Sequence, residues 1–349
     1  MPVLSGVLIR GGEDGLDLTA TDLDLTIQAH VGAQVTDPAS IVLPARYLLD
    51  IVRRLPGEGV EIETTDTRAV VRSGSSRFTL NGVSIRAFPD IPRADGATVV
   101  LPADALRDLF RRTAFAVAND ESRPILTGVH LQSDGNVLRA TATDGYRVAV
   151  ASREGTSLGR SMSVVVPGRV LNEVERVLPA DGDVTVVLGE STVVFEVGPF
   201  RVIGRLLDGT YPDVLSLLPQ EYPFKLTVDR QALFDALSRA DLLAGGQDTR
   251  HRVELQCDAH KVVVIAQDPE LGAAREELEV EYHGEPLRIG FNARYLMDGL
   301  KVIDADTVRI GFVSPDKAAL VEGGGNGDYQ YIVLPVLLPA EAETEAKEV

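Results

Sequence analysis

TATDLDLTI, residues Thr19 to Ile27, decides the fold, because it returns as TATDGYRVA at residues Thr141 to Ala149. Further matches lie outward from this pair at nearly the same offset. PVLSGVLI at Pro2 recurs as PILTGVHL at Pro124, VLPARYLLDIVRRLP at Val42 as VVPGRVLNEVERVLP at Val165, and AFPDI at Ala87 as TYPDV at Thr210. A third, weaker copy contains AQDPE at Ala266 and FNARYLMDGLKVID at Phe291. A repeat of this length indicates tandem domains rather than the turns of a solenoid.

The repeat predicts three α+β domains over residues 1–97, 98–222 and 223–338, and we expect the acidic tail 339–349 to be disordered. The second and third copies predict a strand, a helix, antiparallel strands, a second helix and further strands. The first copy begins at the antiparallel strands, so about 22 residues of strand and helix would precede Met1 in a complete unit. The sequence therefore predicts a first domain that lacks its first strand and helix.

Local patterns place the elements of the second copy. An apolar stripe through Leu106, Leu109 and Phe110 predicts a helix from Ala103 to about Ala118. A strand is predicted from Ile125 to Gln132, and Pro167 suits the first turn of a helix that ends near Leu178.

Composition excludes several classes of protein. The single cysteine, Cys257, rules out an intrachain disulfide, and no Cys/His spacing suggests a metal, so no cofactor is predicted. No apolar run approaches the ~18–20 residues that span a bilayer, which favours a cytoplasmic protein without a membrane segment. The net charge of −18 argues against a conventional nucleic-acid binder, although one face can still be basic.

Basic residues recur at matched places on the predicted helices. Pairs seven residues apart point the same way on a helix, and Arg107 and Arg111 lie four apart. A solvated helix face is one interpretation, and a surface that faces a polyanion is the other. With no Trp and few other aromatics, contact with phosphates irrespective of base sequence is favoured over base readout. The pairs are Arg46 and Arg53, Arg169 and Arg176, and Arg294 and Lys301.

Catalysis is the weaker interpretation of the acidic residues. Asp22, Asp24 and Asp144 fall in the repeated Thr-Asp turn, where Asp side chains commonly accept bonds from nearby backbone N–H groups. The five histidines share no motif, and nothing resembles a nucleophile elbow or a phosphate loop. We predict a protein without an active site.

The chain resembles the bacterial sliding clamp, the beta subunit of DNA polymerase III. The resemblance covers Met1 to Leu338 and rests on RPILTGVHL at Arg123, LRATATDGYRVAV at Leu138, TYPDV, FNARYLMDGL and YIVLPVLLP at Tyr331. It implies three tandem clamp domains, two helices packed on antiparallel sheet in each, and a head-to-tail ring homodimer around double-stranded DNA. It also implies a non-catalytic processivity factor whose partners are DNA polymerases, the clamp loader and repair factors.

The resemblance further implies three sets of residues. The DNA-facing set would be Arg46, Arg53, Arg107, Arg111, Arg123, Arg169, Arg176, Arg294 and Lys301. A hydrophobic peptide-binding pocket would comprise Leu126, Thr143, Gly145, Tyr146, Arg147, Val148, Pro212, Leu217, Asn292, Tyr295, Ala318, Ile332, Leu334, Pro335 and Val336. The dimer interface would join Phe78 and Leu80 to Leu242 and Leu243.

Alternatives remain open at this stage. Leu126, Val148 and Leu217 could be ordinary core residues. Three family positions depart from the usual residue: Tyr146 replaces His, and Ser216 and Leu337 replace Arg, which could alter peptide preference. The whole chain could be a clamp paralogue that binds peptides or inhibitors without encircling DNA. An enzyme built on the triplicated scaffold is the third hypothesis.

Overall fold

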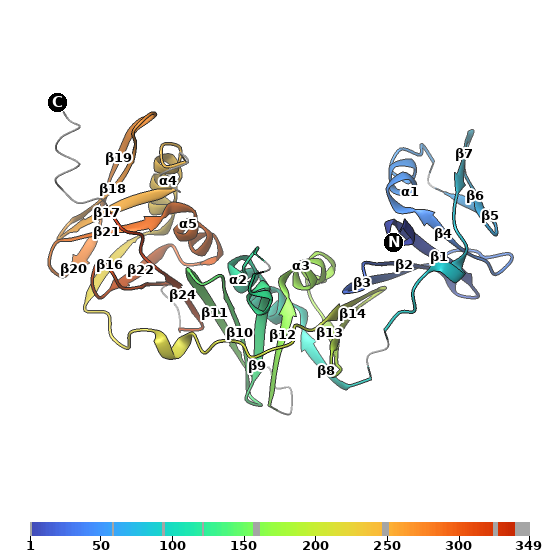
Figure 1. Cartoon of the computed structure of the whole chain (residues 1–349), viewed down its shortest axis with the longest axis horizontal. Coiled ribbons are helices and arrows are strands. Elements are labelled where there is room, and N and C mark those ends of the chain that lie inside the picture. The colour runs from blue at the N-terminus through green and yellow to red at the C-terminus, as the bar shows by residue number, and fades with distance from the viewer. Residues whose placement is uncertain are drawn as a thin grey trace. The chain divides into compact units, whose positions relative to one another are not determined.

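The computed structural model describes residues 2–57, 59–92, 95–120, 122–155, 161–245, 251–323 and 327–338 (Figure 1). The chain forms two compact units, the first of Met1–Leu106 and Arg169–Leu207 and the second of Arg107–Gly168 and Asp208–Val349. The division falls inside the second repeat, so the predicted boundaries of the three domains stay a prediction. The predicted disordered tail, residues 339–349, lies outside the described residues.

An antiparallel eight-stranded sheet dominates the first unit. Its middle pair, β3 with β15, joins the first repeat to the second, with Leu25 opposite Gly204. A smaller sheet holds β5 (Glu61–Thr65), β6 (Arg68–Ser73) and β7 (Ser76–Asn81). The strands of the large sheet, in spatial order, are β4 (Ser40–Pro44), β1 (Gly6–Gly12), β2 (Gly15–Thr21), β3 (Leu25–Val31), β15 (Phe200–Arg205), β14 (Thr192–Val197), β13 (Asp183–Leu188) and β8 (Ala97–Pro102).

The two helices of the first unit differ in how much they bury. Helix α3 (Gly168–Val177) buries Val170, Leu171 and Val174 completely. Helix α1 (Ala45–Val52) buries none of its residues, and Leu49 and Val52 are 49% and 42% exposed. Within the described residues the first repeat holds this single α-helix, in agreement with the element order predicted from the repeat.

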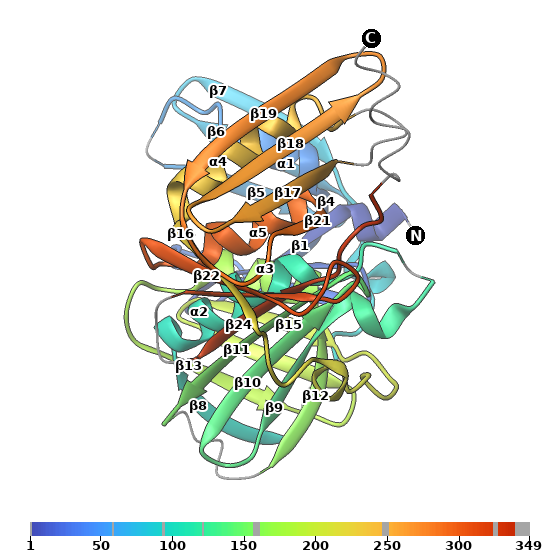
Figure 2. The same cartoon turned by 90° about the vertical axis from the view of Figure 1, so that its left-hand side faces the viewer.

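A nine-stranded antiparallel sheet dominates the second unit. Here β11 pairs with β24 and joins the second repeat to the third, just as β3 and β15 join the first to the second. The strands in spatial order are β12 (Met162–Pro167), β9 (Gly128–Ser133), β10 (Val137–Thr143), β11 (Arg147–Glu154), β24 (Tyr329–Val333), β23 (Ala319–Gly323), β22 (Thr307–Phe312), β16 (Phe224–Asp229) and β20 (Glu281–His283). A four-stranded sheet holds β19 (Gly272–Glu279), β18 (Lys261–Asp268), β17 (Arg252–Asp258) and β21 (Leu287–Asn292) (Figure 2).

The helices of the third repeat are capped and packed together. Asp229 accepts from the Ala232 amide at 2.7 Å and so caps α4 (Arg230–Asp241), while Asn292 accepts from the Arg294 amide at 2.9 Å and caps α5 (Ala293–Val302). A Cβ on Gly299 would collide with the ring of Tyr331, so this glycine permits close approach of α5 to β24. The same side of α5 is thereby held over the nine-stranded sheet.

Three details of the second repeat differ from expectation. Helix α2 (Ala103–Thr113) stops before Ala118, because the chain tightens into a 3₁₀ turn at Ala114–Ala116. Ile125 lies in another 3₁₀ turn, Pro124–Thr127, instead of a strand. Pro167 ends β12 opposite Gly128 and precedes the helix. The predicted burial of Leu106, Leu109 and Phe110 is confirmed.

Among the described residues, no helix combines the length and apolar content that a membrane span requires.

Candidate functional site

The turn between β10 and β11 is the centre of the predicted peptide-binding residues. Asp144 Oδ1 accepts from the amides of Tyr146 at 2.9 Å and Arg147 at 3.1 Å, and Thr143 Oγ1 donates to the Arg147 carbonyl at 2.6 Å. Gly145 has a φ of +92°, a conformation that side-chain-bearing residues rarely adopt. These bonds fix the turn and leave Tyr146 61% exposed at its tip.

Arg147 organises the surroundings of this turn. Its Nε donates to Asp144 Oδ2 at 3.0 Å, Nη1 to Asp298 Oδ2 at 2.7 Å and Nη2 to the Phe115 carbonyl at 2.9 Å. The guanidinium lies over the ring of Tyr295, 4.5 Å from its centroid. Only 8% of Arg147 is exposed. Burial acts to lower the pKa of Arg147, but neighbouring Tyr331 and Asp298 outweigh it and the pKa is raised.

Exposed apolar groups gather beside Arg147. Tyr146 stacks on Tyr295 with ring centroids 6.5 Å apart, and the Tyr331 hydroxyl donates to the Tyr295 carbonyl at 2.7 Å. The Leu334 amide donates to the Tyr146 carbonyl at 2.9 Å, which holds Leu334, 42% exposed, next to the turn. An apolar surface with a rigid charged support can bind a hydrophobic peptide.

The remaining predicted pocket residues divide by accessibility. Pro212 is exposed, and Val148, Asn292, Pro335 and Val336 are half-buried. Leu126, Ala318 and Ile332 are 4%, 9% and 2% exposed, so they are core residues in the free protein. The placement of the Leu217 side chain falls outside what the structure describes. Whether these residues bind peptide stays a prediction.

Internal comparison shows why the first unit lacks an equivalent surface. Leu25 occupies the position in the first repeat that Arg147 occupies in the second. Leu25 pairs with Gly204 across the first junction, and Arg147 pairs with Val333 across the second. The repeat places Leu23, in an unusual positive φ of 86°, at the position of Gly145. Val170, fully buried, stands where the repeat has Tyr295. The arginine and aromatic groups that build the surface are therefore present at one junction of the repeats.

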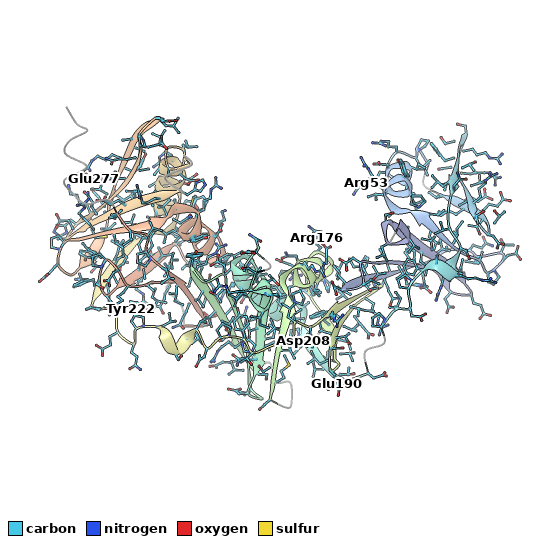
Figure 3. All side chains as sticks on the ribbon, viewed as in Figure 1. Arg53, Arg176, Glu190, Asp208, Tyr222 and Glu277 are labelled. Atoms are coloured by element: carbon cyan, nitrogen blue, oxygen red, sulfur yellow. The ribbon has the colours of Figure 1, made fainter. Side chains whose placement is uncertain are left out.

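The predicted DNA-facing cations on the helices are mostly paired with acids. Arg169 contacts Asp22 at 2.8 Å and Asp24 at 3.1 Å. In Figure 3, Arg53 directly follows α1 and Arg176 lies on α3. Arg46 and Arg53 are exposed and form no ion pair with another described residue. The other helix pairs are Arg176 with Glu173 at 2.7 Å, Arg294 with Asp241 at 3.3 Å, Lys301 with Asp298 at 3.3 Å, and Arg111 with Asp304 at 2.7 Å.

The remaining two predicted DNA-facing residues, Arg107 and Arg123, differ in exposure. Arg107 is half-buried. Arg123 is exposed, lies before the 3₁₀ turn at Pro124–Thr127, and donates to the Asp144 carbonyl at 3.3 Å. Arg123 thus supports the turn of the peptide surface as well.

The predicted dimer-interface residues are accessible and lie beside free strand edges. Phe78 is 40% exposed on β7, which pairs with β6 alone among the described strands. Leu242 is 76% exposed directly after α4, whose neighbour β19 pairs with β18 alone in the described part of the chain. Leu80 and Leu243 are half-buried.

The aspartates considered for catalysis have structural partners. Asp22 Oδ1 accepts from the amides of Asp24 at 3.0 Å and Leu25 at 2.7 Å, the same turn that Asp144 builds. Among the described residues, no group of three or more His, Cys, Asp and Glu side chains is arranged to hold a metal ion.

Sequence reasoning missed three supports of the site: Phe115, Asp298 and a cluster around Asp108. Arg112 Nε contacts Asp108 at 2.8 Å and Arg153 Nη2 contacts it at 3.0 Å, while Arg111 and Arg112 reach Asp304 in the third repeat. This network ties α2 and β11 to the third repeat. The basic stretch RDLFRR, residues 107–112, is the sequence pattern that could have indicated this network, but its arginines also fit a DNA-facing helix.

The fold defines a protein built from three related α+β repeats in tandem. The DNA polymerase III beta subunit family matches in all three of its domains: N-terminal at residues 1–92, central at 100–213 and C-terminal at 215–337. The chain belongs to the DNA polymerase III beta subunit family.

Individual relatives agree over almost the whole chain. The beta sliding clamp of Staphylococcus aureus strain Mu50 is 31% identical over 96% of this chain and 92% of the relative. The crystal structure of the Bacillus subtilis DNA polymerase sliding clamp matches with a TM-score of 0.89 and 32% identity, covering 97% of this chain and 93% of that one. A ligand-bound Pseudomonas aeruginosa clamp matches with a TM-score of 0.90 and 35% identity over the same shares.

Proposed function

We infer that this protein is a DNA sliding clamp, a processivity factor of the replicative polymerase that acts by topological tethering and not by catalysis. The observation that carries this inference is the three-domain match to the DNA polymerase III beta subunit, supported by the three-repeat fold. We place it with DNA in the cytoplasm. The peptide-binding paralogue that does not encircle DNA is not favoured by these matches.

Ring closure would use two copies of the chain, head to tail. Strand β7 would add to β19 of the next copy, because each has a free edge in the described part of the chain. Their charges are complementary: β7 carries Arg77, and β19 carries Glu277, marked in Figure 3, and Glu279. Phe78 and Leu80 would then pack against Leu242 and Leu243. Light scattering should give twice the chain mass of 37.5 kDa, and a mass of one chain at micromolar concentration would contradict ring closure.

DNA contact would be weak and independent of base sequence. Acid partners already neutralise most helix cations, so a phosphate must compete with them, which suits a ring that slides. Arg46 and Arg53 have no such competitor among the described residues. Replacing both with alanine should lower the slope of log affinity against log salt by about 2 for linear duplex DNA, since each lost phosphate contact removes about 0.9.

The matched control for that measurement is the Arg10→Ala/Arg86→Ala variant. Both arginines are exposed and lie in the first unit outside its α-helices, Arg10 on β1 and Arg86 in the 3₁₀ turn Ile85–Ala87. The control should keep the slope of the unmodified protein. Equal slopes for all three proteins would exclude Arg46 and Arg53 from DNA contact.

Peptide binding would use the surface around Tyr146. Leu334→Asp should weaken binding of a hydrophobic peptide by about 100-fold, because the new carboxylate loses water when an apolar side chain covers it. Fluorescence anisotropy with a labelled Leu-Phe-containing peptide measures the change. Val100→Asp is the control, since Val100 is 57% exposed on β8 in the other unit. Unchanged affinity of Leu334→Asp would remove Leu334 from the site.

A further inference from the structure

A cavity of about 480 Å³ opens on the nine-stranded sheet, and none of its lining residues belongs to the predicted peptide, DNA or dimer sets. Strands β16, β22 and β23 form its floor, and the segment before β16 forms one wall. Tyr222, on that segment in Figure 3, packs over Gly311, where an added Cβ would lie 2.8 Å from the Tyr222 Cβ. The volume lies within the usual range of ligand pockets, roughly 300–1,000 Å³.

Charged side chains line this cavity without being paired to one another. Lys225, Arg309 and Glu221 are exposed, and Glu322 is half-buried on β23 opposite Arg309. None of the four forms an ion pair with another described residue. Elsewhere in this unit arginines such as Arg111, Arg112 and Arg147 contact acids at 3 Å or less. Burial and the charge of Glu322 both raise the pKa of Tyr222. Lys225 and Arg309 are thus left to face an incoming group.

The cavity continues the sheet row that carries the peptide surface. Val148 is opposite Ile332, Ile332 opposite Leu320, Leu320 opposite Gly311, and Gly311 opposite Lys225. Residues directly opposite one another lie on one face of a sheet, at about 4.8 Å per strand. Four steps from Val148 therefore reach Lys225 after roughly 19 Å, the span of about six extended residues.

We propose that this cavity binds the acidic flank of the same peptide whose apolar residues dock around Val148 and Tyr146, with a carboxylate near Lys225 and Arg309. The proposal rests on the peptide-binding function inferred above. A guanidinium and an ammonium both favour carboxylate oxygens, and Arg309 can bind one with two parallel hydrogen bonds. The favoured ligand carries Asp or Glu about six residues from its apolar anchor.

Fluorescein-labelled peptides test the proposal by anisotropy. Each holds a Leu-Phe anchor, five alanines and then Glu, Gln or Lys, and the spacer with its last residue is placed either before or after the anchor. The Glu peptide of one orientation should bind about five- to tenfold more tightly than its Gln counterpart. Lys225→Ala/Arg309→Ala should abolish that gain and leave the Gln peptide unaffected.

The outcomes distinguish failure of the acidic-flank proposal from failure of the peptide-binding function on which it rests. Lys261→Ala, a surface lysine on β18, should keep the full gain. Equal binding of Glu and Gln peptides, or tighter binding of the Lys peptide, overturns the acidic-flank site while the peptide surface stands. Failure of every peptide to bind contradicts the peptide surface itself, and this proposal with it.

Discussion

Arg147→Ala should lower the free energy of unfolding by about 3 kcal/mol, the lower end of the range for removing one partner of a buried ion pair. The substitution leaves the Asp144 carboxylate, whose side chain is only 13% exposed, without its guanidinium partner. Asp298, at 31% exposure, is better hydrated and keeps Lys301. The Arg147→Ala substitution also removes the guanidinium that packs on the face of the Tyr295 ring. Peptide affinity should fall by at least tenfold as Tyr146 and Tyr295 lose their fixed positions.

Chemical denaturation followed by circular dichroism measures the stability change. Arg139→Ala is the matched control, because Arg139 lies on neighbouring β10 with its side chain exposed and only a 3.4 Å bond to Ser152. It should change stability by less than about 0.5 kcal/mol. Arg147→Lys should recover part of the loss, since it restores the charge but not the fork of donors. A loss below 1 kcal/mol for Arg147→Ala would show that the arginine does not hold the site together.

Leu242→Asp should convert the dimer to monomers by raising its dissociation constant about 100-fold. An interface anchor contributes 2 kcal/mol or more, and a buried unpaired carboxylate adds a penalty. Leu242 is 76% exposed in the single chain, so the monomer should keep its fold and thermal stability. Sedimentation equilibrium over a range of protein concentrations measures the constant.

The control for Leu242 is another exposed leucine of the same unit. Leu337 is 89% exposed beyond the end of β24, and Leu337→Asp introduces the same charge away from the proposed interface. It should remain a dimer. Dissociation by both variants would point to a general effect of charge, and dissociation by neither would place the interface elsewhere.

The repeat predicted most of the fold because matched blocks must adopt matched structures. The Thr-Asp turn followed from the repeat, and the apolar stripe of the second copy predicted the burial of Leu106 and Phe110. The predicted ends of some helices and strands were wrong where hydrogen bonds in the folded protein set the last residue of the element. The Thr113 hydroxyl, for example, donates to the Leu109 carbonyl at 2.6 Å where α2 ends.

The support of the site could not be predicted, because it joins segments far apart in sequence. Asp298 lies 151 residues from Arg147, and no local pattern shows that β11 pairs with β24. The resemblance supplied the pocket residues but not their accessibility, so Leu126 and Ile332 entered as pocket residues although they are core residues in the free protein. Pairing of distant strands sets that burial.

The central claim is that two chains close a ring around DNA, and retention on circular DNA tests it most directly. A clamp loaded on nicked circular plasmid should stay bound through gel filtration in high salt, because a topological link does not depend on ion pairs. Cutting the plasmid once with a restriction enzyme should release it. Retention after linearisation, or loss in high salt while the DNA remains circular, would contradict encirclement.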